Sequence, residues 1–380
     1  MIQNELTKIF KKKSIYITLL ITLIFIIVIN IIYVNSNSHY GYDPAQDVEF
    51  YESQIAMLQE DNSQSAQESI SIYQSEIDSA KLIQKYGNTA TWQANIIYNY
   101  IRPLFQEKSQ YIQAENEQEA QKVQKQIEEL VAKLDAGDWH YFAKQELREI
   151  EASLQEQKQL KENAVDTNTI ASIDDQIFDL ELQKQVVNWR LEKDIPYGYS
   201  YWNTCLTNYQ DAQREIRDYE KSSNKDNYTA KQGYYSSLEK AAISQYDIEN
   251  KVESGNSSNA RGLLLHGCSQ FELFIIIMII MVTGTIVSEE FNKGTIKLLL
   301  IKPYKRSTIL ASKWITSLIM LFIIIISVLL MQFVVGGMVQ GFDTFDTPAV
   351  VYDHTTNQIG EMNIVAYLGM QILGKLTIYV

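Results

Sequence analysis

Four long apolar runs stand out in this chain of 380 residues. The first, at 14–34, contains no charged residue, and 21 helical residues reach about 31 Å, which matches the hydrocarbon core of a bilayer. A cleaved signal peptide would have a shorter apolar core followed by a small-residue cleavage site, and this sequence has neither. The pattern therefore predicts an uncleaved transmembrane helix at 14–34. It predicts further spans at 263–287, 314–335 and 362–380, the last of them incomplete.

Basic residues gather before the first span and between the second and third spans. These residues are Lys8, Lys11, Lys12 and Lys13, and then Lys293, Lys297, Lys302, Lys305, Arg306 and Lys313. Two spans separate the clusters, so both face the same side, which the positive-inside rule places in the cytoplasm. We therefore expect a multi-pass protein of the cell membrane. Residues 1–13 and 288–313 are expected to be cytoplasmic, and 35–262 and 336–361 extracellular.

The first of these segments has a helical pattern of its own. Ile2, Leu6, Ile9 and Phe10 recur at helical spacing, which favours a short amphipathic helix on the inner membrane surface. A solvated cytoplasmic tail is the alternative.

The long segment after the first span is acidic and rich in helical patterns. Residues 35–270 hold 22 Lys and Arg and 38 Asp and Glu, a net charge of −16, which argues against binding of nucleic acid or anionic lipid. Apolar residues recur at intervals of three and four in two stripes, at 143–154 and 170–191. We expect connections at 137–138, 163–169, 195–198 and 222–227. The predicted fold is an all-α membrane protein, a bundle of transmembrane helices with a large, coiled-coil-like extracellular helical domain at 35–262.

Tyrosines cluster in this domain, at Tyr197, Tyr199 and Tyr201 beside Trp202. Packing between helices is one explanation, and an exposed surface that binds a peptide or a wall component is the other. Cys205 and Cys268 lie outside the cytoplasmic segments, but nothing in the sequence brings them close enough to pair. The four histidines stand alone without the spacing of ligands, so no metal site is predicted.

The cytoplasmic loop between the second and third spans is unusually apolar. Two carboxylates, Glu289 and Glu290, come just past the membrane, and Gly294 offers a break. Thr295–Ile301 is strongly apolar with one lysine, and Pro303 ends it ahead of the next helix. Such a segment needs cover, either from the membrane interface or from a groove on a partner protein.

This loop resembles that of the membrane subunits of type-2 ABC transporters. Those subunits share an acidic residue, then Gly-Thr-Ile or Gly-Thr-Leu, a pair of leucines, a proline and an arginine between spans two and three. The matching residues are Glu290, Gly294, Thr295, Ile296, Leu299, Leu300, Pro303 and Arg306, with Lys313 at a position that is often basic. The segment Glu5–Phe10 is also similar to that family, and the resemblance covers 1–35 and 262–380.

The resemblance implies a permease subunit of an ABC exporter whose loop docks on a separate ATPase. It implies six spans per subunit, of which four are visible here, and a dimer of permeases in the lipid bilayer. ATP and magnesium would bind the partner, because this chain lacks the Gly-x-x-x-x-Gly-Lys-[Ser/Thr] phosphate loop and binds no cofactor of its own. The transported substrate stays open.

Two ionisable residues, Glu272 and Lys375, fall in the second and fourth predicted spans. Such groups are often functional within a membrane, and for Glu272, near the outer end of its span, a residue of the membrane interface is the favoured alternative. Two other kinds of protein also stay open. One is a four-span, mechanotransmission-type ABC permease with a large outer domain. The other is a membrane-anchored helical scaffold without transport activity, such as a polysaccharide chain-length regulator.

Overall fold

The computed structural model of the chain describes residues 2–38, 43–61, 63–223, 225–255, 258–292 and 306–379. The chain divides into two compact units. The terminal unit comprises Met1–Ser38 and Glu253–Val380, and the inserted unit comprises His39–Val252. Each unit has hydrophobic clusters of its own.

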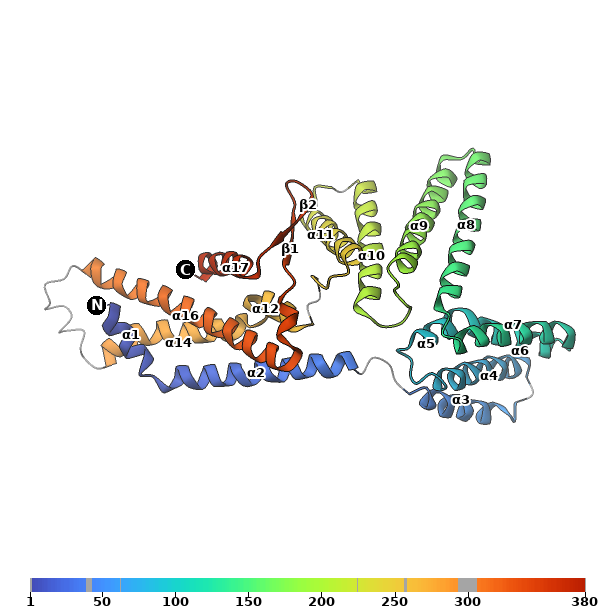
Figure 1. The fold of residues 1–380 in the computed structure, drawn as a ribbon, viewed down its shortest axis with the longest axis horizontal. Coiled ribbons are helices and arrows are strands. Elements are labelled where there is room, and N and C mark those ends of the chain that lie inside the picture. Colours follow the sequence, from blue (N-terminus) through green and yellow to red (C-terminus); the bar gives the residue numbers. More distant parts are fainter. Residues whose placement is uncertain are drawn as a thin grey trace. The chain divides into compact units, whose positions relative to one another are not determined.

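The terminal unit is mostly helical, with one β-hairpin before the last described helix (Figure 1). Its elements are α1 (Ile2–Phe10), α2 (Lys13–Ser38), α12 (Ala260–Leu265), α13 (Gly267–Gln270), α14 (Glu272–Asn292), α16 (Arg306–Gln340), η2 (Phe342–Phe345), β1 (Ala349–Asp353), β2 (Gln358–Met362) and α17 (Ile364–Tyr379).

Helix α16 is the centre of this unit, and α1, α2, α12, α14 and α17 all pack against it. The core between these helices includes fully buried Ile26, Phe271, Met278, Ile325 and Val328. Many of the helical residues are β-branched isoleucines, which favour strands in water. In a hydrocarbon environment a helix is nevertheless favoured, because it satisfies its backbone hydrogen bonds within one segment.

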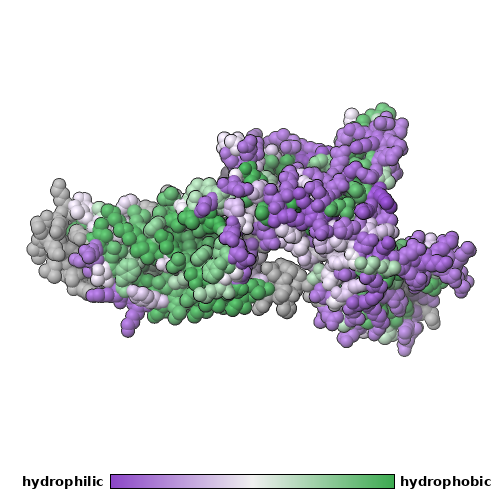
Figure 2. Space-filling model, viewed as in Figure 1, coloured by the Kyte–Doolittle hydropathy of each residue, from purple (hydrophilic) through white to green (hydrophobic). Residues whose placement is uncertain are grey.

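The surface of the terminal unit is apolar as well as its core. Figure 2 shows hydrophobic residues over its helices and hydrophilic residues over the inserted unit. On α2, Ile17, Leu20, Ile24 and Ile32 are each more than half exposed. Soluble domains rarely expose so continuous an apolar face, so this helix needs lipid or another protein against it.

Length and composition support membrane crossing for part of this unit. Among the described residues, Lys13–Val34 and Ser307–Gln340 are helices long and apolar enough to span a bilayer. Glu272–Gly284 and Ile364–Leu376 are shorter apolar helices. The four-span arrangement stays a prediction.

The second predicted span, 263–287, is built from three helices instead of one. Helix α12 stops at Leu265 and α13 stops at Gln270, with His266 and Phe271 at the breaks. Close approach of α12 to α16 depends on Gly336, since a Cβ there would lie 2.9 Å from the Cβ of Ala260. Helices α14 and α16 also continue past the limits of the predicted spans, so the segment between them is only 293–305.

The segment at 336–361, predicted as a loop, contains regular structure that the sequence analysis did not anticipate. Strands β1 and β2 pair antiparallel, with Ala349 opposite Met362 and Asp353 opposite Gln358. The turn is held by the Asp353 carboxylate, which accepts hydrogen bonds from the Thr355 backbone and the Thr356 hydroxyl. The described chain is otherwise helical, which agrees with the predicted all-α class.

The inserted unit is entirely helical over its described residues. Its elements are α3 (Ala45–Leu58), α4 (Gln64–Gln84), α5 (Trp92–Ile96), the π-helix η1 (Ile97–Ile101), α6 (Arg102–Gln113), α7 (Glu117–Asp135), α8 (Trp139–Asn163), α9 (Thr167–Glu192), α10 (Tyr201–Lys221) and α11 (Tyr228–Asn250). Consecutive helices pack in pairs, α3 with α4, α6 with α7, α8 with α9 and α10 with α11.

The apolar stripes predicted from the sequence form one of these pairs. One buried cluster joins the two helices: α8 contributes Ala143, Ile150 and Leu154, and α9 contributes Val187. Each of the four predicted connections lies between two helices or overlaps such a junction. At each junction a polar side chain caps the helix that follows; these residues are Asp138, Asp166, Ser200 and Asn227. Such residues mark the start of a helix in a sequence, so the junctions could be predicted.

The tyrosine cluster is divided between packing and exposure. The Tyr197 hydroxyl donates to Glu146 Oε2 at 2.5 Å, and burial together with that carboxylate raises the pKa of Tyr197. The Tyr201 hydroxyl donates to the buried carboxylate of Asp247. Tyr199, in contrast, is 67% exposed. Cys205 is buried in the inserted unit and Cys268 in the terminal unit.

Gly198 lets the connection before α10 lie against the start of α5. Its φ is +95°, and a Cβ there would lie 2.9 Å from the backbone nitrogen of Trp92. We expect Gly198→Ala to destabilise the inserted unit by about 1–3 kcal/mol, because both the backbone conformation and the close contact are lost.

The matched control is Gly233→Ala in α11, where an added Cβ meets nothing within 4 Å. That change removes a flexible residue from a helix and should be neutral or stabilising by up to about 1 kcal/mol. The measurement is hydrogen exchange of the full chain in peptides covering 87–100 and 195–205. Exchange there should be faster in Gly198→Ala than in the wild type, and no faster in Gly233→Ala. Equal exchange rates in the two variants would contradict the role of Gly198.

Candidate functional site

The helix ends that flank 293–305 form the structural frame of the predicted coupling loop. Glu289 and Glu290 lie in the last turn of α14, and Arg306 is the first residue of α16. The remaining predicted coupling residues lie outside the described residues; they are Gly294, Thr295, Ile296, Leu299, Leu300 and Pro303. The structure therefore places the ends of the loop and leaves its docking role a prediction.

A lysine ties these two helix ends together. The Lys313 ammonium group, on the second turn of α16, donates to the backbone carbonyl of Ile286 on α14 at 2.9 Å. Ile286 lies about two turns before the end of α14, so its carbonyl has a partner within the helix and accepts the lysine as a second donor. One turn further along α16, the buried Thr316 hydroxyl donates to the carbonyl of Ser312. The Lys313 bond therefore holds α14 and α16 together close to the loop.

Helix α1 packs against the same pair of helices. Figure 1 shows α1 beside the end of α14 and the start of α16, and α1 contacts both. Its apolar face points inward, with Ile9 1% exposed and Leu6 packed against the same core. The predicted amphipathic helix is present, and it packs on this unit's own helices.

Three amide side chains join α2 to α16, two of them inside the apolar core. The Asn30 amide nitrogen donates to Gln332 Oε1 at 3.1 Å and to the carbonyl of Ile26 at 2.9 Å. Gln340 donates to Asn30 Oδ1 at 3.2 Å. Asn30 and Gln332 are both fully buried. Between membrane helices such a hydrogen bond contributes on the order of 1 kcal/mol, and it fixes how the two helices face each other.

Glu272 and Lys375, singled out from the sequence one by one, form an ion pair. The Lys375 ammonium group lies 3.1 Å from Glu272 Oε2, so α17 is joined to the first turn of α14. The lysine side chain is 19% exposed and the glutamate side chain 37%. Each charge thereby gains a partner in a region of low polarity, where an unpaired charge is costly.

A buried arginine connects two chain segments at the other end of α16. Arg261 is fully buried at the start of α12. Its guanidinium group donates to the carbonyls of Ser254 at 2.9 Å, Thr347 at 2.9 Å and Pro348. The planar fork of donors suits this arrangement of several carbonyls. Arg261 therefore fixes the segment that leads from η2 to β1.

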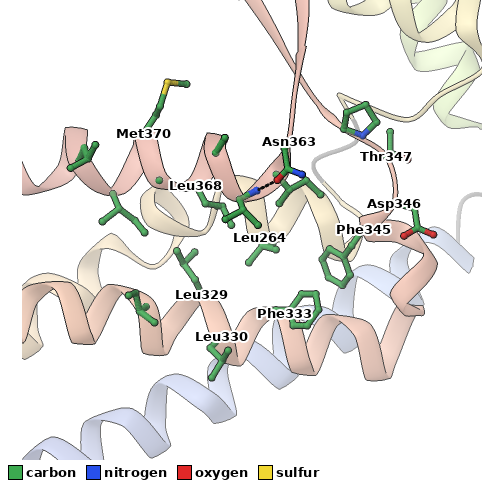
Figure 3. A pocket seen from close by; sticks show the side chains of 18 of the residues that line it. Leu264, Leu329, Leu330, Phe333, Phe345, Asp346, Thr347, Asn363, Leu368 and Met370 are labelled. Carbon is green, nitrogen blue, oxygen red and sulfur yellow. Dashed lines mark hydrogen bonds between the residues drawn. The ribbon is translucent and has the colours of Figure 1, made fainter.

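An apolar cavity of about 1030 Å³ lies between α16 and α17 (Figure 3). Its walls carry Leu329, Leu330 and Phe333 from α16 and Leu368 from α17, and Leu264 closes it from α12. Its polar lining residues are Asp346, Thr347 and Asn363. Figure 3 shows Asn363 at the start of α17, and Asp346 and Thr347 on the segment that leads from η2 to β1. Thr347 is held by Arg261, so the arginine shapes one end of the cavity.

No group of three or more His, Cys, Asp or Glu is placed to hold a metal ion within the described ranges. The polar contacts described above join the helices of the terminal unit inside an apolar body.

Comparison with known proteins identifies the family. The model of the family described as "ABC-2 family transporter protein" matches residues 1–356 of this chain. The chain belongs to this family. It is also 28% identical over 155 residues to "Uncharacterized protein YhcI" of Bacillus subtilis (strain 168), a match that covers 40% of this chain and 47% of that protein. No solved structure matches the chain.

Membership in the ABC-2 family confirms the resemblance read from the loop and the first residues. It makes the chain a membrane protein and points to the membrane subunit of a transporter and not to its ATPase. The match runs through the inserted unit, which the sequence analysis had left outside the resemblance.

Three features of this ABC-2 protein were missed from the sequence. Asn30 and Gln332 interrupt apolar runs as single amides, a signal that could have predicted their pairing. Arg261 lies within α12, two residues before its leucines, where a charge is unexpected. The ion pair between Glu272 and Lys375 depends on how α14 and α17 pack, and the sequence holds no marker of that.

Proposed function

We propose that this ABC-2 protein is the permease subunit of an ATP-driven exporter that works with a separate ABC ATPase. The observation that carries the proposal is the apolar segment Thr295–Ile301 between α14 and α16, in a chain that matches the family over 1–356. Seven mostly apolar residues between two such helices are best explained by a partner that covers them.

The proposed orientation places the N-terminus and 288–313 in the cytoplasm and the inserted unit outside the cell membrane. Packing of α1 on α14 and α16 supports it, because α1 carries Lys8 and precedes three further lysines. The N-terminal basic cluster and the start of α16, which carries Arg306 and Lys313, then lie at one end of the terminal unit. One positively charged end is what the positive-inside rule requires.

In the proposed mechanism, ATP and magnesium bind only the partner ATPase, and this chain converts the partner's movement into helix repacking. The loop acts as a coupling helix. Lys313 makes α14 and α16 respond together, and α16 runs from this end to the cavity it shares with α17. The ion pair between Glu272 and Lys375 is a contact that can open and close as α17 moves against α14.

The family resemblance further implies a dimer of permeases and six spans per subunit, and both belong to the proposal. A mechanotransmission-type permease is a neighbouring possibility, which the Gly-Thr-Ile-Lys-Leu-Leu-Leu pattern at 294–300 disfavours. A scaffold without transport activity would have no partner ATPase to cover the apolar loop. Transport function therefore explains more of the chain than either alternative.

Affinity purification from the native membrane tests the proposal. The full chain, tagged on the inserted unit and extracted in mild detergent, should bring down a protein with the phosphate-binding motif Gly-x-x-x-x-Gly-Lys-[Ser/Thr]. That protein should hydrolyse ATP when it elutes with the chain. Recovery of the chain without any such ATPase, after cross-linking in intact cells, would support a scaffold instead.

A further inference from the structure

A cavity of about 710 Å³ in the inserted unit has a neutral, hydrogen-bonding lining. Its lining residues are Thr89, Asn95, Tyr98, Gly198, Tyr199, Ser200, Asn203, Thr204, Thr207 and Asn208. None of these residues carries a charge. Two other cavities of the same unit are lined by charged side chains, among them Arg217 in one and Lys184 in the other. In so acidic a domain, a lining without charges indicates a neutral ligand.

Two helical segments form the walls of this cavity. One wall is the start of α10, which contributes Thr204, Thr207 and Asn208. These residues are at positions i, i+3 and i+4, so they share one face of the helix. Asn95 lies on α5 and Tyr98 on the π-helix η1. A π-helical turn inside an α-helix is rare and is often found at functional sites, because it changes the direction in which its side chains point.

The connection between α9 and α10 forms the third side, and it is held in place by several bonds. The buried Arg190 donates to the carbonyl of Ile195 at 3.0 Å and to Asn203 Oδ1 at 2.8 Å. Asn203 in turn donates to the carbonyl of Pro196 at 2.8 Å. The Tyr199 backbone N–H donates to the carbonyl of Ala90 at 3.3 Å. Tyr199 is thus presented from a fixed backbone, as a binding residue should be.

Several side chains of the cavity are placed to meet a ligand. Tyr199 is 67% exposed and offers an aromatic face with a polar tip. Among the described residues, neither the Thr207 hydroxyl nor the Asn208 amide has a hydrogen-bond partner. Together they supply donors and acceptors at the rim of a volume within the range of about 300–1,000 Å³ that is typical of ligand sites.

We propose that this cavity binds a neutral oligosaccharide. A sugar matches each property of the lining: many hydroxyls that donate and accept, no net charge, and C–H faces that stack on an aromatic ring. A peptide would present charged termini or side chains that nothing in the lining pairs with. The inference concerns the inserted unit alone and stands apart from the proposed coupling to an ATPase.

The test uses the full chain in lipid nanodiscs, because maltoside detergents carry a sugar that would compete. Calorimetry with maltotetraose, cellotetraose and N-acetylated chitotetraose measures binding of neutral sugars. We expect at least one of them to bind. A cationic counterpart of that sugar, in which an amine replaces an N-acetyl or hydroxyl group, should bind about tenfold more weakly, because the lining has no carboxylate to pair with the ammonium group. Tyr199→Ala and Thr207→Lys should each weaken the binding about tenfold or more.

Tyr228→Ala is the matched control, since Tyr228 is 73% exposed on α11 and does not line the cavity. Its affinity should equal that of the wild type. Thr207 is exposed on a helix, so Thr207→Lys keeps the fold, which circular dichroism can verify. Absence of binding to all three sugars would overturn the proposal. So would equal loss in Tyr228→Ala, or tighter binding of a cationic tetrapeptide than of any sugar.

Discussion

Leu299→Glu should reduce recovery of the ABC ATPase with this chain by about tenfold or more, while the chain still inserts into the membrane. Leu299 belongs to the apolar segment that is proposed to enter a groove on the ATPase. A glutamate there would place an unpaired carboxylate in that groove, and burial of such a charge is strongly unfavourable. Quantitative mass spectrometry of the purified complex gives the ratio of the two subunits. Gly294→Pro, which stiffens the start of the segment, should act in the same direction.

The matched control is Gln358→Glu, which adds the same charge to an exposed position of β2 in the hairpin. Its recovery of the ATPase should equal that of the wild type. Membrane insertion of each variant is checked by its resistance to carbonate extraction. Wild-type recovery of the ATPase by Leu299→Glu would mean that the loop is not the docking element.

Lys375→Met should destabilise the terminal unit by about 2 kcal/mol, because it leaves Glu272 without the ammonium group that lies 3.1 Å away. The loss is smaller than for a fully buried pair, since the Glu272 side chain keeps 37% of its surface exposed. The measurement is the thermal unfolding midpoint of the purified chain in nanodiscs, followed by the loss of monodisperse protein on heating.

Lys375→Arg, the single change Glu272→Leu and the double change Glu272→Leu with Lys375→Met separate pairing from packing. The arginine keeps the charge and should retain most of the stability. In the double variant no charge is left unpaired, so its midpoint should recover toward that of the wild type. A double variant that loses as much as both single changes added together would show that the two residues do not act as a pair.

The general class of the structure could be predicted from the sequence, because helix patterns are local. The stripes at 143–154 and 170–191 and the capping residues Asp138, Asp166 and Asn227 fix helices and their junctions within a few residues of chain. The amphipathic pattern of residues 2–10 was equally visible. Such signals need no knowledge of what packs against them.

What could not be predicted depends on contacts between distant segments. The breaks at His266 and Phe271 lie in a stretch without Pro, and the sequence does not show that α12 packs against α16, with Gly336 facing Ala260. The hairpin at 349–362 carries only a weak alternation of apolar residues. The bonds of Arg261 to Thr347 and Pro348 join residues more than 80 positions apart. No local pattern marks such pairings.

For the candidate site the division is similar. The loop residues were recognised from their types and order, which a sequence displays, and the family match supports that resemblance. The contacts that would transmit a movement from the loop were not foreseen. Lys313 was noted as a basic residue, but its bond to Ile286 depends on how α14 and α16 pack.

Site-specific cross-linking in intact cells tests the central claim most directly. A photoreactive phenylalanine analogue replaces Leu298 in the apolar segment or, as the comparison, Gln358 in the hairpin. The account predicts a cross-link to the ABC ATPase from position 298 and none from position 358. A cross-link to the ATPase from position 358 alone, or from neither position although the ATPase is present, would contradict it.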